Sequence, residues 1–227
     1  MLTLDGLDIR QGDFRLTADF TVPPGITALI GPSGAGKSTL LSVIAGFFAP
    51  VAGRVTWDAD DLTGRPPGQR PVSMLFQDNN LFPHLTIAQN VGLGLRPDLR
   101  LTQADRALVT AALDQVGLAN FAARKPGALS GGQQSRAALA RVLLADRPVV
   151  LLDEPFAALG PGLRADMLGL VRERLAGRTV LLVTHDPDDA RRVADRAVLV
   201  AQGVASMPVA TGDFFANPPK ALRDYLG

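Results

Sequence analysis

One nine-residue segment near the N-terminus constrains the fold more than any other feature of the sequence. Its glycines, its lysine and its hydroxyl side chains stand in the order of the phosphate-binding loop, G-x-x-x-x-G-K-[ST]. The segment consists of Gly31, Pro32, Ser33, Gly34, Ala35, Gly36, Lys37, Ser38 and Thr39. A short apolar run at 26–30 precedes it, and a helix-like stretch at 37–45 follows it. The sequence therefore predicts a strand, a loop and a helix in succession, with a phosphate held at the loop.

Each residue type in this segment suits a nucleotide phosphate. Glycines let backbone N–H groups converge on phosphate oxygens, and the N-terminus of the following helix adds favourable potential. Lys37 can reach the β- and γ-phosphates, and the Ser38 hydroxyl can ligate Mg²⁺. Such a match arises by chance in about 1% of chains of this length. The predicted strand and helix on its two sides make a chance match a poorer explanation still.

Two acids follow the apolar run at 149–152. In a phosphate-loop enzyme, Asp153 at the end of a buried strand is placed to hold Mg²⁺. Glu154, one residue further, can polarise the attacking water as a general base. Without an upstream phosphate loop, a strand that ends in a solvated acidic turn would be the better interpretation. Because the loop is present, we favour a metal-binding Asp153 and a catalytic Glu154.

A second candidate for anion binding stands at the start of a predicted helix over 133–145. Here a hydroxyl and two glycines come together in Ser130, Gly131, Gly132 and Gln133. Backbone N–H groups at a helix N-terminus bind anions well. Considered alone, the same residues are explained by an ordinary glycine-rich turn with a serine cap.

Strand patterns occur toward both ends of the chain. Apolar residues alternate over 14–22, which marks a half-buried strand in a β-rich opening. Toward the C-terminus, strands are predicted at 148–152 and 179–184, and a helix at 161–176. Strands that alternate with helices form a parallel sheet, which binds ligands at the carboxyl ends of its strands. The predicted fold class is α/β, with a mixed or parallel sheet and an antiparallel β part at the N-terminus.

The middle of the chain is predicted to be helical. Thr102 and Asp105 form a capping-box start, and three apolar residues then recur every four positions. These are Leu108, Ala112 and Val116. We expect an all-helical subdomain at about 78–145 within a single domain over residues 1–227.

Composition excludes several classes of function. The chain has 227 residues, 47% of them apolar, so it can bury a sizeable core. It has no cysteine, which excludes disulfides and cysteine-ligated metals. Its formal net charge is +1, from 23 Lys and Arg against 22 Asp and Glu, so we expect no nucleic-acid partner. Its apolar runs fall well below the roughly 20 residues of a membrane span, and the N-terminus carries no readable export signal.

The order of five motifs resembles that of the ATP-binding-cassette ATPases. These motifs are the loop at 31–39, Gln77, the segment 129–133, the pair Asp153 and Glu154, and His185. The resemblance covers nearly the whole chain and implies a phosphate-loop NTPase core. It also implies a head-to-tail homodimer with two ATP molecules between the subunits. Each phosphate loop would face residues 129–133, the signature segment, of the other subunit.

The resemblance assigns roles to two residues that carry little signal alone. Gln77 would contact Mg²⁺ and the attacking water and would sense a membrane permease, whereas His185 would contact the γ-phosphate. A glutamine after a strand is usually a loop residue, and a histidine before an Asp-Pro pair could simply precede a helix cap. The family adds Gln77 and His185 to Glu154 as catalytic candidates. It also adds Gln77 to Ser38 and Asp153 as ligands of Mg²⁺.

Within the family, residues 71–95 resemble the ATP-binding subunits of bacterial thiamine importers. Such a subunit hydrolyses ATP at the cytoplasmic face of the bacterial plasma membrane. There it drives a separate permease, which receives its cargo from a periplasmic or extracellular binding protein. An oxyanion importer, such as one for molybdate, is the nearest alternative, because residues 12–16 resemble those subunits. Many of those carry a C-terminal regulatory domain, for which residues 186–227 leave no room, so we expect thiamine or its phosphates as the cargo.

Several positions depart from the family pattern. Gln11 stands near the place of the aromatic residue that stacks on adenine. Phe14 is the substitute, although it fits equally well as an inward-facing strand residue. Gly160 replaces an Asp, Gln134 replaces a basic residue, and Ser135 stands where another Gln is common. These departures predict slower hydrolysis or weaker coupling than is typical.

Other classes that use a phosphate loop fit the sequence less well. A cassette ATPase of DNA repair would carry a long coiled-coil insertion between Gln77 and Leu129, and that interval has no heptads. A translation-type protein would have two cassettes in one chain. A small-molecule kinase would leave the segment 129–133 unexplained, and a non-hydrolysing regulatory subunit would lack Glu154.

Overall fold

The computed structural model describes residues 1–218 and 220–226, which form two compact units. The first unit comprises Met1–Val72, Pro148–Asp153 and Leu175–Gly227. The second unit comprises Ser73–Arg147 and Glu154–Arg174. The expected single domain over residues 1–227, with a helical subdomain at about 78–145, stays a prediction.

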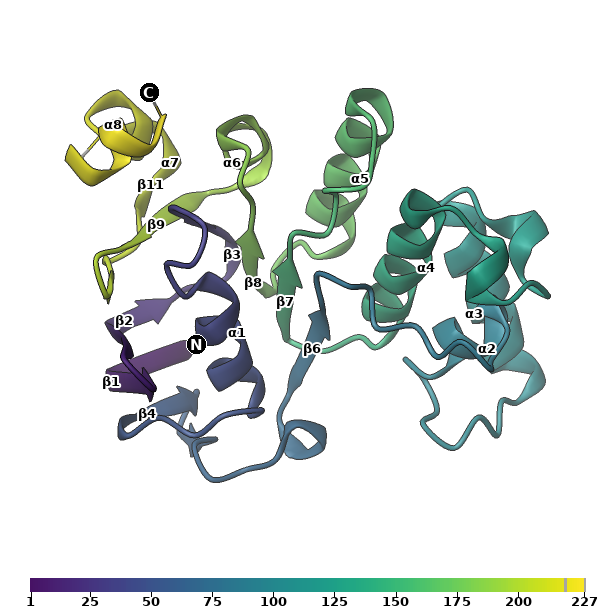
Figure 1. Cartoon of the computed structure of the whole chain (residues 1–227). Coiled ribbons are helices and arrows are strands. Elements are labelled where there is room, and N and C mark those ends of the chain that lie inside the picture. Colours follow the sequence, from purple (N-terminus) through teal and green to yellow (C-terminus); the bar gives the residue numbers. More distant parts are fainter. Residues whose placement is uncertain (219, 227) are drawn as a thin grey trace. The chain divides into compact units, whose positions relative to one another are not determined.

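The first unit is built on a mixed sheet (Figure 1). Its strands are β1 (Leu2–Gln11), β2 (Phe14–Val22), β3 (Gly25–Ile30), β4 (Ala52–Trp57), β5 (Asp60–Asp61), β7 (Val149–Asp153), β8 (Thr179–Val183), β9 (Arg196–Ala201), β10 (Val204–Ala205) and β11 (Val209–Ala210). Neighbouring strands follow the order β5-β4-β1-β2-β10-β9-β3-β8-β7, and β11 pairs with β9. β1 pairs antiparallel with β2 and β4, whereas β8 pairs parallel with β3 and β7. The predicted antiparallel part and parallel part are thus both present.

The burial of this unit follows from its sequence. β7 and β8 are buried along their whole lengths and are nearly continuous apolar runs, as expected of central strands in a parallel sheet. Helix α1 (Lys37–Ala45) packs against both strands. Three shorter helices follow β8, namely α6 (Pro187–Val193), α7 (Thr211–Ala216) and α8 (Lys220–Leu226). One buried side chain from each joins a core cluster with Ile30: Ala190, Phe214 and Leu222.

Helices dominate the second unit, which begins within β6 (Val72–Leu75). They are α2 (Ile87–Gly92), α3 (Gln103–Gln115), α4 (Gly131–Leu144) and α5 (Pro161–Arg174). α2, α3 and α4 pack against one another (Figure 1). All three begin with a capping box, and the box that was predicted at Thr102 and Asp105 is confirmed. Among the described residues of the chain, no helix is long and apolar enough to cross a bilayer.

The predicted apolar stripe of α3 is wrong at one position. Leu108 is 50% exposed, because a strict spacing of four drifts by about 40° per step around a helix of 3.6 residues per turn. The buried stripe instead follows the i, i+3, i+4, i+7 spacing of an amphipathic helix. Its members are Val109, Ala112, Leu113 and Val116.

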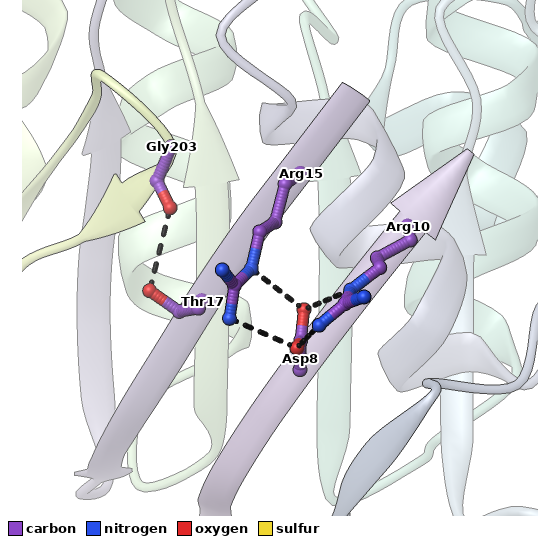
Figure 2. A network of polar contacts seen from close by, with 5 residues as sticks. All are labelled: Asp8, Arg10, Arg15, Thr17 and Gly203. Atoms are coloured by element: carbon purple, nitrogen blue, oxygen red, sulfur yellow. Dashed lines mark hydrogen bonds and ion pairs between the residues drawn. The ribbon is translucent and has the colours of Figure 1, made fainter. Parts of the chain in front are cut away.

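An ionic network joins β1 to β2 near their hairpin (Figure 2). Arg10 and Arg15 stand directly opposite each other on the two strands, where like charges repel. Asp8 accepts hydrogen bonds from Nε and Nη2 of both arginines, at 2.7 to 3.3 Å. The hydrogen bond from Arg10, followed by that from Arg15, lowers the pKa of Asp8 from 3.8 to about 2. One carboxylate therefore holds two cations together.

We predict that Asp8→Asn lowers the midpoint of thermal unfolding at pH 7, because the two arginines are left without their shared anion. The pKa of Asp8 is lower in the folded chain, so its contribution is fully present above about pH 4 and is lost as the pH falls toward 2. The difference between the variant and the wild type should therefore shrink over that range in a calorimetric series. Asp13→Asn, in the turn between the same strands, is the control. A difference that persists unchanged at pH 2 would contradict this account.

Candidate functional site

Three parallel strands of the first unit end at the same level. Leu29 of β3 pairs with Val183 of β8, and Val183 pairs in turn with Asp153 of β7. The loop at 31–39 follows β3, Asp153 is the last residue of β7, and His185 stands two residues after β8. Three of the predicted motifs therefore meet at the carboxyl edge of one sheet, where such sheets bind their ligands.

Backbone conformation and close packing explain two glycines of the loop. Gly36 precedes α1 with a φ of 98°, in the left-handed region that favours glycine. A Cβ at Gly36 would collide with the ring of Phe14 and lie 3.2 Å from Cδ2 of Leu16. A Cβ at Gly31 would collide with the carbonyl oxygen of Val200. The loop is thus held tightly against β2 and β9, and only glycine fits at these points of contact.

Lys37 and the start of α1 shape the inside of the loop. The Lys37 side chain is 7% exposed, and its Nζ donates to the carbonyl oxygens of Gly31 at 2.7 Å and Pro32 at 2.9 Å. No side chain caps the N-terminus of α1, within the part of the chain that the structure describes. Its first N–H groups have no partner within a helix, and such groups are suited to an anion.

Ser38 and Asp153 form the most direct link between two predicted motifs. The Ser38 hydroxyl donates to Oδ1 of Asp153 at 3.1 Å, and Asp153 is only 4% exposed. A hydroxyl beside a buried carboxylate offers the oxygen ligands that Mg²⁺ prefers. In the described residues, no three His, Cys, Asp or Glu side chains gather as metal ligands, so a cation here would need further oxygens from phosphates or water.

A local hydrogen-bond network positions His185. Thr184 is buried before it, and its hydroxyl donates to Oδ2 of Asp189 at 2.9 Å and accepts from the Asp186 amide at 3.1 Å. Asp186 also caps α6, so the helix-cap interpretation of this turn is correct. His185 itself is exposed at the sheet edge. The cap fixes the turn, and the turn presents the imidazole.

The second unit carries the other predicted residues. Gln77 is exposed two residues after β6. Glu154, half-buried, directly follows Asp153 in the chain and has a φ of 45°. A non-glycine residue in this region is strained, and such residues cluster at functional sites. The conformation of Glu154 is therefore a signal that the sequence alone did not provide.

The signature segment opens α4. Ser130 Oγ accepts from the amide of Gln133 at 3.3 Å, and Oε1 of Gln133 accepts from the amide of Ser130 at 2.9 Å. A Cβ at Gly132 would lie 2.9 Å from Leu159, so the loop before α5 packs closely on this turn. The serine-cap interpretation is thus correct, and it leaves Ser130 exposed at a helix start.

Two of the positions that depart from the family pattern have clear local surroundings. Nε2 of Gln134 donates to the carbonyls of Pro126 at 3.1 Å and Leu129 at 3.2 Å, and so fastens the turn before α4. No atom lies within 4 Å of a Cβ built at Gly160. Neither observation tests turnover, so the slower hydrolysis expected from these positions stays a prediction.

We predict that Gly36→Ala destabilises the chain by about 2 kcal/mol or more, because it adds a collision with Phe14 to an unfavourable φ. Urea unfolding would measure the loss. Gly34→Ala is the matched control, since its φ of 76° is also in the region that favours glycine and no atom lies within 4 Å of its Cβ. Equal losses in the two variants would contradict the packing of Phe14 on the loop.

The chain is similar to known proteins along its whole length. A family model described as ABC transporter matches residues 17–157. The thiamine import ATP-binding protein ThiQ of Cereibacter sphaeroides is 62% identical over 230 residues, which cover 100% of both chains. The protein of the same name from Ruegeria sp. is 56% identical with the same coverage. That from Yersinia pseudotuberculosis is 50% identical over 89% of this chain and 87% of its own.

Solved structures of the cassette MJ0796 share this fold. Its dimer in a post-hydrolysis state with ADP and Pi is 29% identical to this chain and has a TM-score of 0.83. The match covers 93% of this chain and 99% of that one. A second dimeric structure of the same cassette gives the same values. These matches confirm the α/β fold class that the sequence predicts.

Proposed function

The chain belongs to the ATP-binding-cassette transporter family, and on that premise we propose that it hydrolyses ATP to drive thiamine uptake through a separate membrane permease. Membership confirms the resemblance seen in the order of the five motifs. The contact between Ser38 and Asp153 beside the phosphate loop is the observation that carries the ATPase part. The names of full-length relatives at 56–62% identity support thiamine as the cargo.

ATP is the proposed nucleotide, held by the loop at 31–39. Lys37, which donates to two loop carbonyls, would turn its ammonium to the β- and γ-phosphates. The uncapped N–H groups of α1 would donate to phosphate oxygens. Phe14 lies against Gly36 of the loop, and this closeness to the phosphate site supports a role for its ring beside the adenine.

Mg²⁺ is the proposed metal, with Ser38, Asp153 and Gln77 as its protein ligands. The hydroxyl of Ser38 and the buried carboxylate of Asp153 fit a hard cation. When bound with ATP, the ion would neutralise charge on the β- and γ-phosphate oxygens. The protein's part is to hold the oxygen ligands in place, and the fully buried strand β7 fixes the position of Asp153.

The proposed reaction is phosphoryl transfer to water. The water oxygen attacks the γ-phosphorus, and the bond between that phosphorus and the ADP oxygen breaks. The proton of the water passes to the carboxylate of Glu154, which acts as general base. His185 would contact the γ-phosphate, and Gln77 would orient the water. The protein thus contributes mainly position and charge.

Two copies of the chain are proposed to work together. One subunit holds the phosphate loop, and the exposed Ser130 with Gly131 to Gln133 of the other would close over the γ-phosphate. The dimeric state of the similar cassette MJ0796 with ADP and Pi supports the pairing of two copies. The dimer would sit on the cytoplasmic face of the bacterial inner membrane, bound to its permease. A periplasmic or extracellular binding protein would deliver thiamine to that permease.

The test is reconstitution of the chain with a thiamine permease and its binding protein. We expect thiamine to stimulate ATP hydrolysis, and we expect Glu154→Gln to lower the stimulated rate by about a hundredfold or more, because the general base is lost. Glu173→Gln, an exposed glutamate on α5, is the matched control and should retain the rate.

The outcomes separate the two parts of the proposal. Hydrolysis that survives Glu154→Gln would contradict the assigned base. Hydrolysis that is lost in Glu154→Gln but is indifferent to thiamine would keep the ATPase and overturn the cargo. The same assay with a molybdate permease would then test the oxyanion alternative.

A further inference from the structure

The backbone between β6 and α2 is irregular, and a side chain from α4 holds it. Asn79 and Asn80 have φ values of 63° and 44°, in the left-handed region. Arg141 donates through Nη1 to the carbonyl of Asn80 at 2.8 Å and through Nη2 to the carbonyl of Asn79 at 3.1 Å. Burial lowers the pKa of Arg141. A half-buried guanidinium therefore spans two successive carbonyls, which fixes their direction.

Residues 79–86 form one irregular segment, and a second side chain holds its later part. Asn90 of α2 is 0% exposed, and its Oδ1 accepts from the amide of Phe82 at 2.7 Å. Its Nδ2 donates to the carbonyls of Phe82 at 3.0 Å, Leu85 at 3.3 Å and Thr86 at 3.0 Å. Arg141 and Asn90 together provide the segment 79–86 with a frame of six hydrogen bonds, of which the buried Asn90 makes four.

The framed segment presents an aromatic pair to solvent. Phe82 is 43% exposed, and its ring meets His84 edge-on, with centroids 6.0 Å apart. Aromatic residues, phenylalanine among them, are enriched in protein interfaces relative to the rest of the surface. Under the proposed function, the permease is the partner that would bind this aromatic pair.

The same helix that holds this segment also carries the signature serine. Ser130 caps α4, and Arg141 lies eleven positions further, or about 16 Å along a helix axis. A displacement of the segment 79–86 would pull on Asn79 and Asn80, then on Arg141 and on α4. Because a helix moves as a rigid element, Ser130 would move with it.

We propose that Arg141 is a positioning residue that couples the segment 79–86 to the signature segment through α4. This inference rests on the proposed function, since it names how permease binding reaches the ATP site. Through Arg141, the segment 79–86, which carries Phe82 and His84, would move together with Ser130 at the start of α4.

The test compares arginines of one helix in the reconstituted complex. Arg141→Met should keep the permease-free ATPase rate within about twofold and lose about tenfold or more of the permease-stimulated rate, because small misplacements at a catalytic site are costly. Arg141→Lys should retain part of the stimulation, since one ammonium cannot span both carbonyls. Arg136→Met is the matched control, because Arg136 of α4 donates to Val116 and Gly117 instead.

Three outcomes would overturn the inference. If the permease stimulates the ATPase rate of Arg141→Met as strongly as that of the wild type, no coupling passes through Arg141. Equal losses in Arg141→Met and Arg136→Met show a purely structural role. If Arg141→Met fails to fold, Arg141→Lys decides, and full stimulation in that variant contradicts the bidentate clamp. A wild-type chain that the permease does not stimulate would instead overturn the proposed function.

Discussion

The register of three parallel strands is the constraint on which the site depends. Because Leu29, Val183 and Asp153 pair across β3, β8 and β7, the residues that follow them emerge at one edge of the sheet. The hydrogen bond from Ser38 to Asp153 is possible only in that register. A shift of one residue would turn the side chain of Asp153 to the other face of the sheet.

The second unit depends on caps rather than on strands. Capping boxes start α2, α3 and α4, and polar side chains of α2 and α4 fasten the loops between them. Such loops have no ladder of backbone hydrogen bonds, so side chains must satisfy their carbonyl groups. This explains why positions 134, 141 and 90 carry Gln, Arg and Asn, whose side chains can donate hydrogen bonds to backbone carbonyls. It also explains how an irregular segment can transmit a displacement.

Much of this could be predicted from the sequence, for physical reasons. Loop chemistry and strand periodicity are local, so the strand at 14–22, the helix at 37–45 and the box at Thr102 could be predicted at their observed positions. The stripe of α3 failed at Leu108 because a spacing of four only approximates the helical period. The contact of Ser38 with Asp153 could be expected from the motifs, although they lie far apart in the chain. The clamps of Arg141 and Asn90 could not, because their partners are backbone carbonyls that carry no sequence signal.

We propose that the sheet edge forms a site for ATP, with Mg²⁺ at Ser38 and Asp153, and binding measurements test this proposal. The most direct measurement is calorimetric titration of the purified chain with ATP, with and without Mg²⁺, for the wild type and for Asp153→Asn. The account predicts that Mg²⁺ tightens ATP binding to the wild type and that Asp153→Asn removes this gain while binding of metal-free ATP persists. An equal gain from Mg²⁺ in both proteins would contradict the claim.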